Sequence, residues 1–293
     1  MTVGFRRATR RVAVITTSLV VAAASAAGAH DFWLVPDAFS VAAGGRIAAR
    51  GQTSSLFPTS VSAVTPDRIV DARVLTANGD VPVREAAVSG PSLMLGYRPA
   101  REGQHLIAVR LAPRNMRESP ASFRRYLDLE GAPEARQRYE RQGLLPPVGG
   151  DSITRRYAKY AKTFVEVGKG PRAFARAVGH PLELMPLSDP STLRAGDTLR
   201  LRLMMLGKPA AFARLHAGSV VQGAAALTDT VTARRAAADD RSVEADGSGV
   251  VAVTLTRAGL WNVRTIQILP AGKGSGADWD VHWATVTFVV ARR

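Results

Sequence analysis

The sequence predicts a mainly β protein, in which two β-sandwich domains of immunoglobulin- or prealbumin-like type are joined by a helical connector. Three observations lead to this prediction. Short apolar runs broken by Gly, Pro, Asn and Asp occupy residues 30–112, and the same pattern returns in residues 180–293. Between them, residues 113–179 carry apolar and aromatic side chains at helical spacing. Short runs separated by frequent turns are typical of sandwiches.

The first 29 residues are predicted to be a signal peptide. Four arginines precede an apolar run at residues 12–24, which is too short to span a bilayer. The run ends in Ala27-Gly28-Ala29, a small-x-small pattern of the kind that signal peptidase cleaves. We therefore expect cleavage after Ala29 and a periplasmic protein that is not an integral membrane protein. An uncleaved N-terminal anchor is the alternative.

Strands are expected in both outer regions. The first region, residues 30–112, contains an Asn78-Gly79 pair, which is a strong hairpin signal between two strands. In the second region, residues 180–293, apolar residues alternate with polar ones. The runs that we expect to be strands are 32–35, 46–50, 73–76, 81–83, 105–111, 201–205, 250–256, 261–269 and 284–290.

The connector is predicted to be helical. Ser119 followed by Pro120 is suited to begin a helix, with serine as the N-cap and proline at the first position. A second helix is expected at residues 133–141, followed by a loop at 145–150. Aromatic residues at i, i+3 and i+7 predict a third helix over residues 153–167, although residues 163–167 could finish as a strand.

The formal charge of +15 suggests a polyanionic partner, but its distribution argues against nucleic acid. Removal of residues 1–29 takes away four arginines and no acid, which leaves +11. Residues 110–176 hold fifteen basic and seven acidic side chains, without interleaved base-stacking aromatics or a zinc-finger signature. We interpret this segment as a solvated helical face. A patch for anionic lipid head groups is the alternative.

Several classes of function are excluded or disfavoured. The chain has no cysteine, so disulfides and thiolate metal sites are excluded. No G-x-S-x-G elbow or phosphate-binding loop is present. We therefore expect neither an enzyme nor an organic cofactor.

Histidines are the candidate functional residues. Cleavage after Ala29 would make His30 the N-terminal residue, and a terminal histidine can chelate a metal through its α-amine and ring Nδ1. Nitrogen ligands suit copper, nickel and zinc, and Asp31 could add a carboxylate. His105 begins a predicted strand, and His216 lies in the strand-like stretch Ala213-Arg214-Leu215-His216. An extended backbone places Asp278, Asp280 and His282 on one face, which is either a second cation site or an exposed polar edge.

Motifs in a fixed order link the chain to a known family. The opening Ala29-His30-Asp31-Phe32-Trp33-Leu34 after a signal peptide resembles that of the bacterial domain of unknown function 4198. The further matches are Arg156-Tyr157-Ala158-Lys159, Pro181-Leu182-Glu183-Leu184, Leu193-Arg194-Ala195-Gly196-Asp197, Gly259-Leu260-Trp261 and Ala277-Asp278-Trp279. The resemblance covers essentially the whole chain after residue 29. It implies an exported, NikM-like periplasmic component of nickel or cobalt uptake, with His30 and Asp31 in the opening motif.

The chain departs from the family at one position, and two hypotheses for its function are open. Members of the family often carry histidine in the strand after Trp261, where this chain has Gln267, so the resemblance leaves further metal ligands to His105, His216 or His282. The first hypothesis is a divalent metal-binding protein that works with a membrane transporter or receptor component. The alternative is a metal-free β-sandwich module that binds a ligand or protein of the cell envelope.

Overall fold

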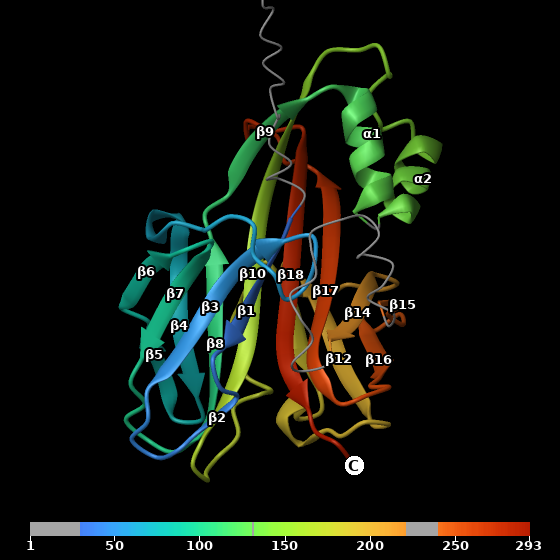
Figure 1. Ribbon diagram of the computed structural model, residues 1–293. Coiled ribbons are helices and arrows are strands. Elements are labelled where there is room, and N and C mark those ends of the chain that lie inside the picture. The colour runs from blue at the N-terminus through green and yellow to red at the C-terminus, as the bar shows by residue number, and fades with distance from the viewer. Residues whose placement is uncertain (1–29, 131, 221–239) are drawn as a thin grey trace, which may run out of the picture.

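The computed structural model describes residues 30–130, 132–220 and 240–293. The protein is mainly β, as predicted, and its strands form three sheets with two helices at one end (Figure 1). The predicted signal peptide, residues 1–29, lies outside the described residues. The proposed division of the chain at residues 112 and 179 stays a prediction.

The central feature is a ten-stranded sheet that runs through both halves of the chain. Its main path follows the order β15-β14-β17-β18-β10-β8-β4-β5, and β2 and β9 also pair with β10. The long strands β10 and β18 lie parallel in its middle. The strands are β2 (Ser40–Val41), β4 (Ile69–Thr76), β5 (Gly79–Pro82), β8 (Gly103–Leu111), β9 (Arg114–Glu118), β10 (Ile153–Val167), β14 (Arg214–Val220), β15 (Arg241–Glu244), β17 (Gly259–Pro270) and β18 (Trp279–Val290).

Two smaller sheets cover opposite faces of this sheet. One has the order β1-β3-β7-β6, and the other has the order β11-β12-β13 with β16 also paired to β12. The first consists of β1 (Asp31–Pro36), β3 (Ile47–Ser54), β6 (Glu85–Ser89) and β7 (Ser92–Tyr97). The second consists of β11 (Leu182–Pro186), β12 (Thr198–Met205), β13 (Lys208–Pro209) and β16 (Val250–Thr254). Short 3-10 helices occur at Pro66–Arg68 and Pro190–Thr192.

Alternating side chains of the large sheet fill two separate cores. On β8, Ile107 packs with Phe32 and Leu34 of the first small sheet, while Leu106 packs on the other side with residues of the second small sheet. Successive side chains of a strand point to opposite faces, so one strand supplies both cores. The molecule therefore has two sandwich-like cores that share a sheet.

The helices form a hairpin at one end of the large sheet (Figure 1). They are α1 (Pro120–Leu129) and α2 (Pro133–Arg141), and Ser119 caps α1 as predicted, its side chain accepting a hydrogen bond from the Ser122 N–H at 3.2 Å. Their apolar faces pack against β17 and β18 through Trp279. Among the described helices, none is both long and apolar enough to cross a membrane.

The third predicted helix is wrong, because residues 153–167 form strand β10. Its aromatic spacing reflects burial on both faces rather than a helical turn. Tyr160 and Phe164 enter one core, whereas Ala161 and Val165 enter the other. A strand covered on both sides shows no clean alternation of polar and apolar residues, and its pattern is therefore easily mistaken for that of a helix.

Candidate functional site

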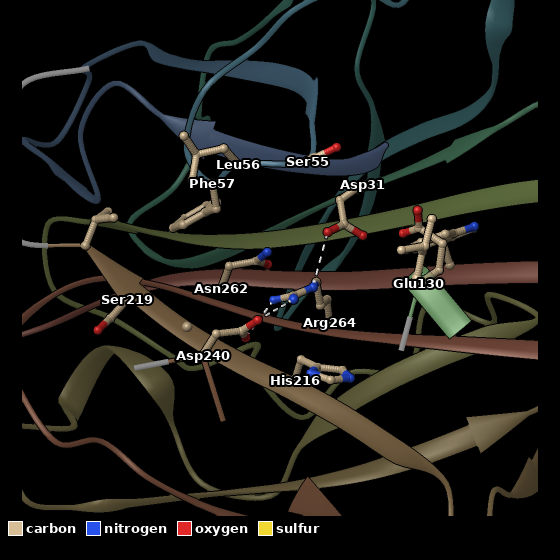
Figure 2. A pocket seen from close by; sticks show the side chains of 14 residues that line it. Asp31, Ser55, Leu56, Phe57, Glu130, His216, Ser219, Asp240, Asn262 and Arg264 are labelled. Atoms are coloured by element: carbon tan, nitrogen blue, oxygen red, sulfur yellow. Dashed lines mark hydrogen bonds and ion pairs between the residues drawn. The ribbon is translucent and has the colours of Figure 1, made fainter. Parts of the chain in front are cut away.

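A cavity of about 230 Å³ lies beside β1, on the face of the large sheet that the first small sheet partly covers. We call it the Asp31 cavity (Figure 2). Strands β14 and β17 form its floor, and the loop after β3 and the end of α1 contribute to its walls. Its lining residues are Asp31, Ser55, Leu56, Phe57, Leu129, Glu130, His216, Gly218, Ser219, Val220, Asp240, Asn262, Arg264 and Trp283.

Charged groups from three distant parts of the chain meet in this cavity. The Arg264 guanidinium lies 3.2 Å from Asp31 and 2.6 Å from Asp240, as the dashed lines in Figure 2 show. Burial opposes the charge of Arg264, but the neighbouring Asp31 and Asp240 carboxylates outweigh it and raise its pKa. Burial likewise works against the charge of Asp240, yet its hydrogen bond with Arg264 holds the pKa of this carboxyl below its usual value. Among the described lining residues, Glu130 brings the total to three carboxylates and one guanidinium.

Uncharged polar groups complete the lining. Asn262 is only 1% exposed, and neither atom of its side-chain amide forms a hydrogen bond within the described part of the chain. A buried amide without a partner costs free energy, so such a group in a cavity marks a position where a water molecule or a ligand would be accommodated. His216 is the cross-strand neighbour of Arg264 and adds an imidazole to the same wall.

The predicted terminal residue lies at the edge of this cavity. His30 precedes β1, and its ring Nδ1 is 2.9 Å from the hydroxyl oxygen of Ser55, which lines the cavity. The Lys159 ammonium donates a hydrogen bond to the carbonyl oxygen of His30. Burial lowers the pKa of Lys159 to about 8. These contacts hold the start of β1 against the large sheet.

The structure thus brings together three of the five residues that the sequence singled out as metal ligands, His30, Asp31 and His216. His105 is buried elsewhere, with its Nε2 3.0 Å from the carbonyl oxygen of Arg101. His282 points to the other face of the large sheet. The roles of His105 and His282 as ligands stay predictions and do not belong to this cavity.

At the second cation site predicted from Asp278, Asp280 and His282, both carboxylates are bound to other residues of the protein. Asp280 binds Arg156 through both carboxylate oxygens, at 2.7 and 2.9 Å, and Asp278 accepts a hydrogen bond from the Thr154 N–H. Gln267 lies directly opposite His282 in the sheet, so no second imidazole stands beside it. Within the described ranges, no group of three or more His, Asp or Glu side chains is arranged to hold a metal ion.

Sequence reasoning missed Arg264, Asp240, Asn262 and Glu130. A signal was present for two of them, because Asn262 and Arg264 alternate with Trp261 and Val263 in a predicted strand. Two polar residues at alternate positions of a strand share a face, but the pattern does not reveal whether that face is exposed or borders a cavity.

Comparisons with known proteins give one clear match. The family model of a domain of unknown function (DUF4198) matches residues 27–268. No curated protein matches the chain.

Solved structures show only distant likeness. An α2-macroglobulin from Salmonella is 14% identical, with a TM-score of 0.21, and the match covers 90% of this chain and 15% of that one. The adhesin InvE of Yersinia pseudotuberculosis is 12% identical, with a TM-score of 0.20 and coverages of 89% and 58%. The Escherichia coli adhesin FdeC is 11% identical, with a TM-score of 0.21 and coverages of 91% and 65%. The chain thus spans less than two thirds of the length of each of these structures, and at such scores they bear on neither fold nor function.

Proposed function

This chain belongs to the DUF4198 family of domains of unknown function, and we propose that it is an exported periplasmic protein which binds a divalent transition metal at the Asp31 cavity. In this proposal the metal is cargo for uptake or delivery of the nickel or cobalt type, passed to a membrane transporter or receptor component. The ligands are the α-amine and imidazole of a mature terminus at His30, with His216 and Asp31 as further donors.

The observation that carries the proposal is the position of His30. Its imidazole contacts Ser55 at the edge of a cavity in which carboxylates outnumber guanidiniums. Cleavage after Ala29 would create the α-amine at that edge. An α-amine has an ordinary pKa of about 7.7, so a metal ion displaces its proton near neutral pH at modest cost.

The donor set fits such a metal only if the α-amine takes part. Nickel, cobalt, copper and zinc accept nitrogen ligands readily, and carboxylates such as Asp31 can serve as additional donors. The described side chains do not form a three-ligand cluster by themselves. Arg264 also occupies one side of Asp31. The terminal chelate is therefore the essential part of the site.

The test compares two forms of the chain that differ by a single residue. One begins at His30, and the other retains Ala29, which converts the α-amine of His30 into an amide. Calorimetry with nickel, cobalt, copper and zinc should show binding by the first form. We expect the second to bind about tenfold or more weakly, because an amide nitrogen is a poor ligand near neutral pH.

Two further outcomes decide the proposal. The affinity of the form that begins at His30 should rise between pH 6 and pH 8, as the α-amine and the imidazole lose their protons. Failure of that form to bind any of the four metals would overturn the proposal. Equal affinities of the two forms would show that the metal is held elsewhere.

A further inference from the structure

A second cavity lies on the opposite face of the large sheet and has the opposite charge. We call it the Arg110 cavity, of about 440 Å³. Its polar lining comes from three neighbouring strands, with Arg110 on β8, Arg156 and Tyr160 on β10, and Asp280 and His282 on β18. Pro113, Pro181, Leu206, Leu269 and Pro270 form apolar walls.

The two arginines of this cavity differ in their partners. Arg156 is neutralised by Asp280, with two hydrogen bonds of 2.7 and 2.9 Å. Within the described residues, the Arg110 guanidinium forms no ion pair, and its buried Nε has no hydrogen-bond partner. The cavity therefore presents one uncompensated positive charge in a partly desolvated setting, where an anion gains the most from pairing with it.

A neutral histidine adds a second donor. The Tyr160 hydroxyl lies 2.9 Å from His282 Nδ1, and the two rings stack at 6.0 Å. Burial raises the pKa of Tyr160 to about 12, so its hydroxyl keeps its proton and donates to Nδ1. Burial also lowers the pKa of His282. The imidazole is then neutral, with its proton on Nε2 as a hydrogen-bond donor.

We infer that the Arg110 cavity binds a small organic monoanion, a carboxylate with an apolar body. The carboxylate pairs with Arg110 and accepts a hydrogen bond from His282, and the body lies against the proline and leucine walls. A single unpaired guanidinium matches one negative charge. A dianion such as phosphate would bring a second charge into the cavity without a partner, at a desolvation cost.

This inference is independent of the proposed metal binding. The positive charge of Arg110, which lines the same cavity as His282, would disfavour a metal ion at that imidazole. Arg110 and His282 both lie on the face of the large sheet opposite to the Asp31 cavity.

The test uses the chain beginning at His30, with hexanoate as the probe and inorganic phosphate as the comparison. Calorimetry should show that hexanoate binds and that phosphate binds at least about tenfold more weakly. Arg110→Gln should weaken hexanoate binding by about tenfold to a hundredfold, since hydrogen bonds to charged groups contribute about 1.5–3 kcal/mol. Arg110→Lys keeps the charge but loses the planar fork, and should have an intermediate affinity.

A matched control uses Arg202→Gln, because Arg202 is an exposed arginine of β12 outside the cavity. This variant should bind hexanoate like the unaltered chain. Melting temperatures of all variants show whether they are folded, and removal of an unpaired guanidinium should not lower that of Arg110→Gln. Absence of hexanoate binding, or equal binding by folded Arg110→Gln, would overturn the inference. Equal affinities for phosphate and hexanoate would overturn the assignment of an apolar body.

Discussion

The two cavities are built on the same sheet, yet their described charged side chains differ in sign. The Asp31 cavity has three carboxylates and one guanidinium, and the Arg110 cavity has two guanidiniums and one carboxylate. On β18, Trp283 lines the first and its neighbour His282 lines the second. Adjacent residues of a strand face opposite ways, so one step along the chain moves a side chain from an acidic site to a basic one.

The charges of the two cavities are also balanced in different ways. Arg264 in the Asp31 cavity is held by two carboxylates, whereas Arg110 in the other cavity has no ion-pair partner within the described residues. One arginine is therefore engaged in ion pairs, and the other is the group that we propose to bind an anion. The formal charge of +15 of the whole chain indicates neither arrangement.

The largest expected effect is a difference in the free energy of unfolding between variants of these two arginines. Arg264→Met leaves two carboxylates facing each other without their cation, and should lower the free energy of unfolding by about 3 kcal/mol, the low end for a broken buried pair because Arg264 is 26% exposed. Arg110→Met breaks no ion pair and should change it by less than about 0.5 kcal/mol. Urea denaturation measures both values. Equal losses in the two variants would remove the distinction.

Folding stability is expected to be sensitive to acid on the face of the large sheet that carries the Arg110 cavity, which we call the basic face. His180 packs on Tyr160 with ring centroids 5.2 Å apart, and burial together with Lys162, Arg73 and Arg110 lowers its pKa to about 3. Below about pH 6.5, the His180 imidazole binds a proton in the unfolded chain but not in the folded chain. The free energy of unfolding therefore falls by about 1.4 kcal/mol for each pH unit below that value. At pH 5 this group alone should cost about 2 kcal/mol relative to pH 7.

Two variants check this prediction by denaturation at pH 7 and pH 5. His180→Phe keeps the aromatic ring and should reduce the difference between the two pH values by about 2 kcal/mol. Asp240→Asn, a change in the Asp31 cavity, should leave that difference unchanged. The lowered pKa of Asp240 makes its contribution present above its ordinary value of 3.8 and lost only at lower pH. An unchanged difference in His180→Phe would refute the prediction.

The smallest expected effect tests whether the two faces bind independently. His216→Gln should weaken nickel binding about tenfold, by loss of one imidazole donor, and leave hexanoate binding unchanged. His282→Gln should reduce hexanoate affinity and leave nickel affinity unchanged. Calorimetry on the two variants with both probes gives four affinities. A loss of nickel binding in His282→Gln would place the metal on the basic face and reverse the comparison.

Much of the fold follows from local patterns in the chain. Alternation and turn residues located the strands around residues 32–35, 105–111, 261–269 and 284–290, and Ser119-Pro120 marked the start of a helix. The failure at β10 has a clear cause: this strand is buried on both faces and carries Lys159 and Lys162 within the protein. Neither burial on two faces nor a buried lysine can be recognised from the periodicity of a single segment.

The candidate sites were predictable only in part. His30 and Asp31 stood out because of their position after the expected cleavage site, and His216 and His282 stood out by residue type. Their separation onto two faces of one sheet depends on the pairing of β17 with β18 and of β18 with β10, and the second of these pairings joins residues more than a hundred positions apart.

The amino-acid sequence by itself determined the mainly β class, the two short helices and the residue types available to bind a ligand. These features arise from interactions between residues near one another in the chain. Tertiary structure alone decided that Arg264 would pair with both Asp31 and Asp240, while Arg110 forms no ion pair with any residue that the structure describes. The energy of a charge depends on its distance to other charges and on its burial, and strand order and register set both across the sheet.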